Sequence, residues 1–143
     1  MSRWLLDTNI VSELSKNQPD ATCLNWLGEH RGQCFISSIT VAEITFGIER
    51  LPEGRRKTEL AQLFAFMLED YEGRFFDFDG NAGREWGRYA AELEADFGAG
   101  WFQQFDLRDT QIAAIARENG LTVATRNTKH FPFCDVVNPF AAS

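Results

Sequence analysis

The spacing of apolar residues along the chain predicts strands and helices in alternation. Short apolar runs typical of buried strands are separated by longer stretches in which apolar residues recur at helical spacing. The strand-like runs cover residues 3–6, 34–36, 75–78, 121–124 and 136–137. The helical stretches lie at residues 10–14, after Pro19-Asp20, and at residues 39–51, 55–70, 80–97 and 107–119. This alternation, with short connections, predicts an α/β fold with a mainly parallel sheet covered by helices on both faces.

Length and composition are those of one compact domain. A chain of 143 residues is long enough for one hydrophobic core and short for two, so we expect a single domain over residues 1–143. Hydrophobic residues make up 44% and charged residues 24%, a balance that excludes disorder and collagen-like repeats. No apolar run approaches the ~20 residues that span a bilayer, and the first residues become charged too early for a signal peptide. We therefore expect a cytoplasmic protein without membrane segments.

The charge balance excludes a broad nucleic-acid-binding surface. The chain carries 14 basic and 21 acidic residues, a formal charge of −7, so its average surface does not attract a phosphate backbone at long range. Contacts with phosphate groups must therefore be local. Two basic runs are candidates, although such runs are also typical of solvated helix ends and loops. They comprise Arg50, Arg55, Arg56 and Lys57 in one segment and Arg126, Lys129 and His130 in the other.

Three acidic residues occupy positions where strands lead into helices. Asp7 directly follows the first strand, Glu43 lies on the helix after the second strand, and Asp109 opens the last long helix. Each has a structural explanation when taken alone: Asp7 as a helix N-cap, Glu43 in an ion pair, and Asp109 as a first-turn acid favoured by the helix dipole. Ligands of parallel α/β sheets bind beyond the carboxyl ends of the strands. We expect the three side chains to converge at that edge.

Convergence of three carboxylates calls for a positive charge. Two carboxylates ~4 Å apart repel by about 4 kcal/mol at an effective dielectric constant near 20, so a cluster must protonate, spread apart or hold a cation. Oxygen ligands with room for water suit Mg²⁺ or Mn²⁺. A zinc site is not expected, because His30 and His130 are isolated and the cysteines form no Cys-x-x-Cys pair. Cys23, Cys34 and Cys134 are expected to be reduced core residues.

Four motifs follow one another along the chain. The first three are Leu5-Leu6-Asp7-Thr8-Asn9, Ser37-Ser38-Ile39-Thr40-Val41-Ala42-Glu43 and Asp109-Thr110-Gln111-Ile112-Ala113-Ala114. The fourth is Leu121-Thr122-Val123-Ala124-Thr125-Arg126-Asn127, followed by Phe131. In this order they resemble the PIN-domain ribonucleases, specifically the VapC-type toxins of bacterial toxin–antitoxin pairs. The resemblance covers nearly the whole chain and implies a PIN-like three-layer α/β/α sandwich with a central five-stranded sheet.

The same resemblance implies a site and an activity. Asp7, Glu43 and Asp109 would be the catalytic acids that hold Mg²⁺, with Mn²⁺ as an alternative, in an endoribonuclease that hydrolyses RNA phosphodiester bonds. The ion would position and acidify the attacking water. The resemblance also implies inhibition by a VapB-type antitoxin, homodimerisation, and binding of operator DNA only through the toxin–antitoxin complex.

The fourth motif departs from the family pattern. Members often carry a further acid at the position of Asn127 or of His130, and neither residue is acidic here. The Asn127 carbonyl can ligate or orient water but supplies no charge, and turn formation is its simpler role. Asp106 and Asp135 are the alternative acids.

Two other functions stay open. A non-catalytic PIN-like module, whose acids cap helices or hold a structural ion, would act by binding a partner, and the missing fourth acid favours it. An aspartyl phosphatase would use Asp7 as its nucleophile. Such enzymes normally need a second acid two residues further on, where this chain has Asn9.

Overall fold

A computed structural model describes residues 2–141 and contains a five-stranded sheet in which every neighbouring pair of strands is parallel. The strand order is β3-β2-β1-β4-β5. The strands are β1 (Trp4–Leu6), β2 (Cys34–Ser37), β3 (Phe75–Phe76), β4 (Thr122–Ala124) and β5 (Val136–Val137). Each strand lies within or beside a predicted apolar run, so the predicted parallel sheet is confirmed. β3 is shorter than its run and ends at Phe76.

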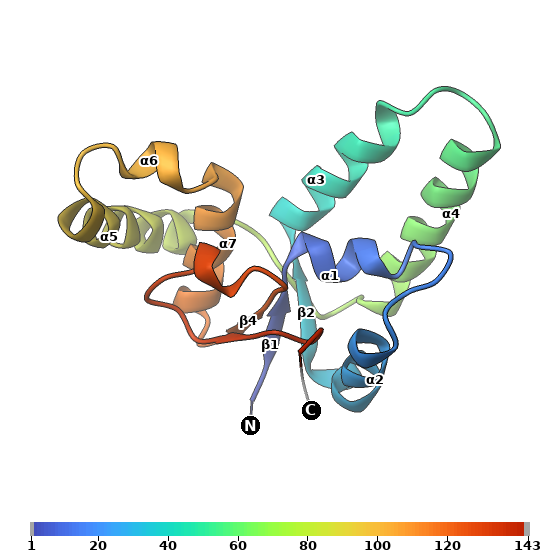
Figure 1. Ribbon diagram of the computed structural model, residues 1–143, viewed down its shortest axis with the longest axis horizontal. Coiled ribbons are helices and arrows are strands. Elements are labelled where there is room, and N and C mark those ends of the chain that lie inside the picture. Colours follow the sequence, from blue (N-terminus) through green and yellow to red (C-terminus); the bar gives the residue numbers. More distant parts are fainter. Residues whose placement is uncertain (1, 142–143) are drawn as a thin grey trace.

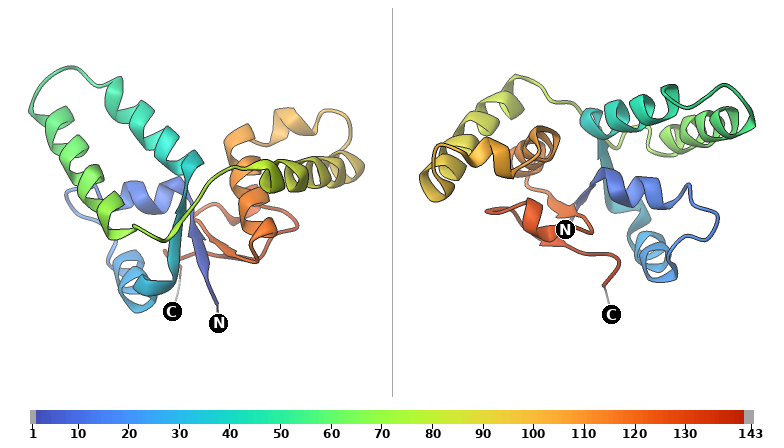
Figure 2. Two further views of the ribbon diagram at one scale, coloured as in Figure 1. Left: turned by 180° about the vertical axis from the view of Figure 1, so that it is seen from behind. Right: turned by 45° about the horizontal axis from the view of Figure 1, so that its top comes forward.

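Helices lie on both sides of the sheet, as Figures 1 and 2 show. One side carries α1 (Thr8–Glu13), α2 (Ala21–His30), α3 (Ser38–Glu49) and α4 (Arg55–Asp70). The other side carries α5 (Gly80–Phe97), α6 (Trp101–Gln104) and α7 (Leu107–Glu118). Short 3₁₀ helices occupy Arg31–Gln33 and Thr128–His130. The predicted three-layer α/β/α sandwich is confirmed, and within residues 2–141 no helix has both the length and the apolar character to cross a membrane.

Two hydrophobic cores hold these layers together, one on each face of the sheet. Successive side chains of the central strand β1 point to opposite faces. Leu5 packs in the core that contains Tyr89 and Ile112, and Leu6 packs in the core that contains Ile10. Both leucines are fully buried, and burying a leucine side chain contributes about 1.5–3 kcal/mol to folding. The apolar Leu5-Leu6 pair therefore fixes β1 between the two helical layers.

Helix α6 has no counterpart among the predicted helices. It contains four residues, too few for apolar periodicity to be recognised in the sequence. Trp101, its first residue, packs against the core on the α5 and α7 side. The short helix is thus set by tertiary packing.

The order of the strands creates a switch point beside β1. The chain adds β2 and then β3 on one side of β1 and afterwards returns to the other side to add β4 and β5. At such a point the segments that follow neighbouring strands diverge and leave a crevice at the carboxyl edge of the sheet. Asp7 follows β1 and Thr125 follows β4, and the Asp7 backbone N–H donates to the Ala124 carbonyl at 2.9 Å.

Candidate active site

Asp7 is the first residue after β1 and the N-cap of α1. Its Oδ1 accepts a hydrogen bond from the Thr8 backbone N–H at 2.8 Å, so the N-cap interpretation is confirmed. Its Oδ2 has a different role, because it accepts from the Thr125 hydroxyl at 2.8 Å and from the Asn9 amide at 3.2 Å. Capping therefore uses one carboxylate oxygen, and the other is oriented by the segment that follows β4.

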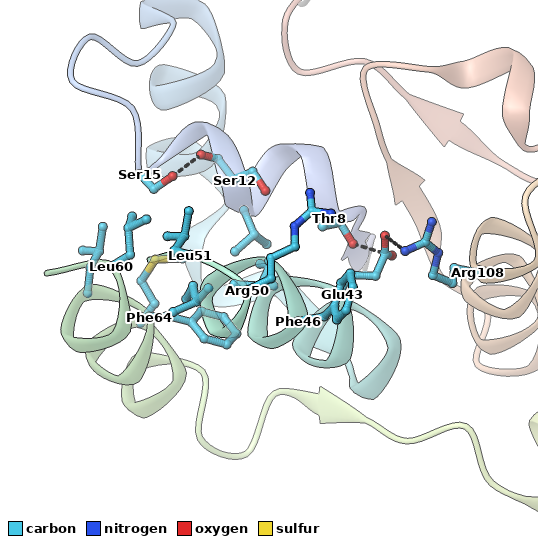
Figure 3. Close-up of a pocket in the computed structure, with 16 residues that line it drawn as sticks. Thr8, Ser12, Ser15, Glu43, Phe46, Arg50, Leu51, Leu60, Phe64 and Arg108 are labelled. Atoms are coloured by element: carbon cyan, nitrogen blue, oxygen red, sulfur yellow. Dashed lines mark hydrogen bonds and ion pairs between the residues drawn. The ribbon is translucent and has the colours of Figure 1, made fainter. Parts of the chain in front are cut away.

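Glu43 reaches the same edge from α3. Ser37 caps this helix, and Glu43 stands on its second turn. Glu43 Oε1 accepts from the Thr8 hydroxyl at 2.9 Å, and that hydroxyl lies 3.1 Å from the Thr40 hydroxyl. Glu43 Oε2 lies 3.6 Å from Arg108 Nη1, which makes an ion pair (Figure 3). The expected partner of this half-covered carboxylate is thus a threonine hydroxyl together with an arginine.

Asp109 lies in the first turn of α7, which is capped by Asp106. A helix N-terminus lowers the pKa of a nearby carboxyl group. Here, however, burial together with the charges of Asp7 and Asp106 raises the pKa of Asp109 to about 7. Within residues 2–141 the basic side chain that contacts Asp109 is His130, whose Nδ1 lies 3.3 Å from Asp109 Oδ2. Desolvation and repulsion between acids therefore outweigh the helix dipole at this position.

The three acids share one electrostatic environment. Burial raises the pKa of Asp7 and of Glu43 as well, and the Asp7 charge raises the pKa of Glu43 further. Their oxygens are the donor type that hard divalent cations prefer, and their mutual repulsion is the kind that such a cation relieves. The donors therefore fit Mg²⁺ or Mn²⁺ in chemistry and charge. As the side chains stand, residues 2–141 contain no group of three acidic, histidine or cysteine side chains gathered closely enough to hold a metal ion.

The candidates for a fourth acid have separate surroundings. Asp135 directly precedes β5 and lies at the amino end of the strands, away from the other acids. Asp106 lies near the three acids, but its carboxylate caps α7 and binds the Arg108 guanidinium at 3.2 Å. The Asn127 backbone N–H donates to the Thr125 hydroxyl at 3.0 Å, which makes this residue part of the turn after β4.

The basic residues singled out from the sequence are differently engaged. Lys57 forms an ion pair with Glu53 at 2.8 Å and donates to the Glu49 carbonyl at 3.0 Å. The Arg126 guanidinium lies 3.9 Å from the centre of the Phe140 ring. Arg50, at the end of α3, lines a groove that leads to Glu43.

Sequence reasoning missed the roles of Thr8, Thr125 and Arg108. The two threonines lie within the motifs, but nothing in their spacing shows which carboxylate oxygen each hydroxyl contacts. Arg108 stands between two acids, Asp106 and Asp109, and this local pattern was the available signal.

The groove beside Glu43 lies between α1, α3 and α4 and has a volume of about 490 Å³ (Figure 3). Most of its wall is apolar, and Thr8, Glu43 and Arg108 form a polar part of its lining. A smaller cavity of about 230 Å³ also touches Glu43 and Arg108. The two cavities share Glu43, Phe46 and Arg108, so these residues are accessible from both.

Fold and site together define a parallel α/β domain with acids at the switch point of its sheet. The PIN domain matches residues 4–136, and the chain belongs to the PIN-domain family. Among similar proteins, the VapC ribonuclease Y4jK of Sinorhizobium fredii is 34% identical over 140 residues, which cover 95% of this chain and 96% of the relative. Toxin FitB of Neisseria gonorrhoeae is 32% identical over 140 residues, which cover 95% of this chain and 97% of the relative.

A solved structure of FitAB bound to an IR36 DNA fragment contains a chain with the same fold. Its TM-score is 0.87 at 29% sequence identity, and the match covers 98% of this chain and 97% of that chain. The likeness extends over the whole sandwich and includes every element that contributes a residue to the acidic site.

Proposed function

We propose that this protein is a metal-dependent endoribonuclease of the VapC type that acts as the toxin of a toxin–antitoxin pair. The proposal is carried by one observation: Asp7, Glu43 and Asp109 interact at the switch point of a PIN-domain sheet, where the charges of Asp7 and Glu43 raise the pKa of Asp109 and the charge of Asp7 raises the pKa of Glu43. The similarity to a protein named as a VapC ribonuclease supports the same reaction. The substrate is RNA, and the bond that is broken is a phosphodiester.

Asp7, Glu43 and Asp109 would hold the divalent ion, Mg²⁺ or Mn²⁺. When bound, the ion supplies positive charge that acidifies the attacking water and stabilises charge on the phosphate. Thr125 and Asn9 fix the orientation of Asp7 Oδ2, and Thr8 does the same for Glu43 Oε1. These hydrogen bonds place the carboxylates before substrate arrives, so less reorganisation is needed during the reaction.

Glu43 Oε2 would accept a proton from the attacking water. It accepts no hydrogen bond from residues 2–141, and its contact with Arg108 is a 3.6 Å ion pair. Burial raises the pKa of Glu43, while the Thr8 hydrogen bond and the Arg108 charge lower it. The water oxygen attacks phosphorus as its proton passes to Glu43, the bond to the leaving 3′ oxygen breaks, and that oxygen takes a proton from solvent, so that the products carry a 5′-phosphate and a 3′-hydroxyl.

The partners follow from the same family membership. We propose that a VapB-type antitoxin restrains the enzyme in the cytoplasm, that the chain forms a homodimer, and that operator DNA is bound only through the complex. The structure of FitAB on DNA supports an assembly of this kind. The formal charge of −7 supports DNA contact through the partner, since the chain lacks a broad basic surface.

The decisive experiment is RNA cleavage by the purified protein. The chain is purified with the partner encoded beside it, separated from that partner, and incubated with cellular RNA in Mg²⁺, in Mn²⁺ or in EDTA. We expect cleavage with either metal, none in EDTA, and inhibition when the partner is returned. Intact RNA under every condition, with a folded protein, would contradict the proposal.

A second candidate is a non-catalytic PIN-like module that binds a partner. Two observations favour it: the described residues lack a ready three-ligand metal cluster, and Asn127 supplies no charge. The cleavage assay separates the candidates, because a binding module would associate with its partner and leave RNA intact in the presence of metal.

A further inference from the structure

Arg108 is the arginine that contacts the acidic site. Its Nη1 lies 3.6 Å from Glu43 Oε2, while Nε and Nη2 each donate to Asp106 at 3.2 Å. A guanidinium group has five N–H donors, and within residues 2–141 the Nη1 group of Arg108 makes no hydrogen bond. The side chain is 52% exposed. Arg108 is therefore held in place by Asp106 through one edge, while its Nη1 group, beside Glu43, keeps N–H donors for an incoming group.

Two residues of α3 continue the surface that begins at Arg108. Phe46 and Arg50 follow Glu43 at positions three and seven residues further on, so all three lie on one face of the helix. Phe46 is 59% exposed although it is a large apolar residue. The Arg50 guanidinium lies 5.3 Å from the centre of the Phe46 ring. Figure 3 shows Arg50, Phe46 and Arg108 at the groove around Glu43.

An exposed aromatic ring between two arginines suits single-stranded nucleic acid. Arginine pairs with phosphate oxygens through its planar fork of donors, and aromatic rings stack on unpaired bases. The two arginines also offset the repulsion that the acids exert on an approaching phosphate group. Of the other candidate cations, Lys57 and Arg126 do not line either of the two cavities that touch Glu43.

We infer that Arg108, Phe46 and Arg50 form a binding strip for single-stranded RNA beside Glu43. Arg108 and Arg50 pair with phosphate groups of the strand, and Phe46 stacks on a base. This inference rests on the proposed ribonuclease function and assigns part of its substrate contact. The two arginines and Phe46 should contribute to RNA binding in different ways. The contribution of the arginines should depend on salt concentration, whereas that of Phe46 should depend on its aromatic ring.

The test measures RNA binding as a function of salt. The full-length protein, free of antitoxin, is titrated into a fluorescein-labelled pool of short random-sequence RNA in a buffer that contains Ca²⁺. The fluorescence anisotropy of the RNA reports binding. Each lost phosphate contact lowers the slope of log K against log salt by about 0.7 for a single strand. We expect this decrease for Arg108→Gln and again for Arg50→Gln. Phe46→Ala should weaken binding about 10-fold with an unchanged slope, and Phe46→Tyr should restore it.

Matched control variants lie outside the groove. Arg84→Gln makes the same charge change at an exposed position of α5, and Phe66→Ala removes another ring, which is 71% exposed. Both controls should bind RNA as the wild-type protein does. Thermal melts of each variant show whether it is folded, and all five altered positions lie at least partly on the surface.

The outcomes separate this inference from the proposed function. The wild-type protein could bind and cleave RNA while Arg108→Gln, Arg50→Gln and Phe46→Ala keep its affinity and its slope of log K against log salt. That result would contradict the binding strip and leave the proposed ribonuclease function in place. Equal losses in the variants and their matched controls would also overturn the strip, because the effect would then come from net charge or general surface change. If the wild-type protein neither binds nor cleaves RNA, the proposed function fails and the strip fails with it.

Discussion

A cluster of charged residues lies at each end of α7, and the two clusters differ in how their acids are paired with basic side chains. At its C-terminal end, Arg117 Nε donates to Glu85 at 2.8 Å and Nη2 donates to Glu92, so one cation stands between two acids of α5. At its N-terminal end, Asp109 shares an environment with Asp7, Glu43 and Asp106, and the basic side chains there are the exposed Arg108 and His130.

The acids at the two ends of α7 differ in whether each is paired with an arginine. At the C-terminal end each acid receives a hydrogen bond from arginine, so the cluster joins α5 to α7 and stabilises the fold. At the N-terminal end four acids share one arginine, Arg108, within residues 2–141, and the pKa of Asp109 is raised to about 7. Perturbed carboxyl groups in a crevice are typical of functional sites, whereas paired groups are typical of structural ones. We therefore expect substitutions at the two ends of α7 to have different effects on the protein.

The largest effect is expected for Asp7→Asn at the acidic end. This change keeps a good helix N-cap but removes a negative charge, so the fold persists while metal-dependent chemistry is lost. RNA cleavage should fall by at least about 1,000-fold, and growth arrest on expression should disappear. Asp96→Asn, at an exposed position of α5, is the matched control and should keep full activity. Undiminished cleavage by Asp7→Asn would remove Asp7 from the site.

The next effect concerns the paired end. Arg117→Leu leaves Glu85 and Glu92 without their shared cation, and the Arg117 side chain is 22% exposed. The free energy of unfolding should fall by about 2–3 kcal/mol, somewhat less than for a fully buried pair. Urea denaturation measures this loss. Arg88→Leu is the control: its ion pair with Glu85 is exposed on the arginine side, so it should cost under about 1 kcal/mol.

Asp109→Asn should stabilise the metal-free protein, and the gain should depend on pH. The pKa of Asp109 is raised from 3.8 to about 7 in the folded state. Between these values the folded protein retains a proton that the unfolded chain has released, so stability falls as pH rises through this window. In EDTA the variant should exceed the wild-type protein by roughly 1–3 kcal/mol at pH 8, with a smaller difference at low pH.

The same prediction can be tested by adding a metal ion instead of changing Asp109. Mg²⁺ at pH 8 should raise the melting temperature of the wild-type protein, because only the folded state offers the gathered acids. The same addition should leave Asp109→Asn nearly unchanged. A variant that gains nothing in EDTA and still responds to Mg²⁺ would show that Asp109 lies outside the metal-binding set.

The smallest effect is expected for a residue that acts through Asp7. Thr125→Val removes the hydroxyl that donates to Asp7 Oδ2 and leaves the shape of the side chain almost unchanged. Orientation of a metal-holding carboxylate by such a partner is typically worth about 10-fold in activity or metal affinity. Thr125→Ser, which keeps the hydroxyl, should recover activity. Equal activity in both variants would mean that Asn9 alone suffices to orient Asp7.

The sequence predicted the strands and most helices because their signals are local. Apolar runs such as Leu5-Leu6 and the helical spacing in residues 80–97 report burial directly. The acids could be singled out for a related reason, since Asp7 and Asp109 stand where a strand or capping residue leads into a helix and Glu43 follows on the second turn of the helix after β2. Helix α6 was not predicted because four residues are too few to show helical periodicity. Arg108 escaped because its partner Glu43 lies on another helix, and no spacing rule connects them.

Hydrophobic periodicity and capping act over a few neighbouring residues, so the sequence alone predicts an α/β chain with acidic residues at or within the first two turns of its helices. The contact of Asp7 with Thr125, which lies 118 residues away, and that of Arg108 with Glu43 arise only when the chain has folded. These contacts depend on strand order and on how α3 and α7 pack. The unequal balance of charge at the two ends of α7 arises in the same way, from elements that meet only after the sheet has formed.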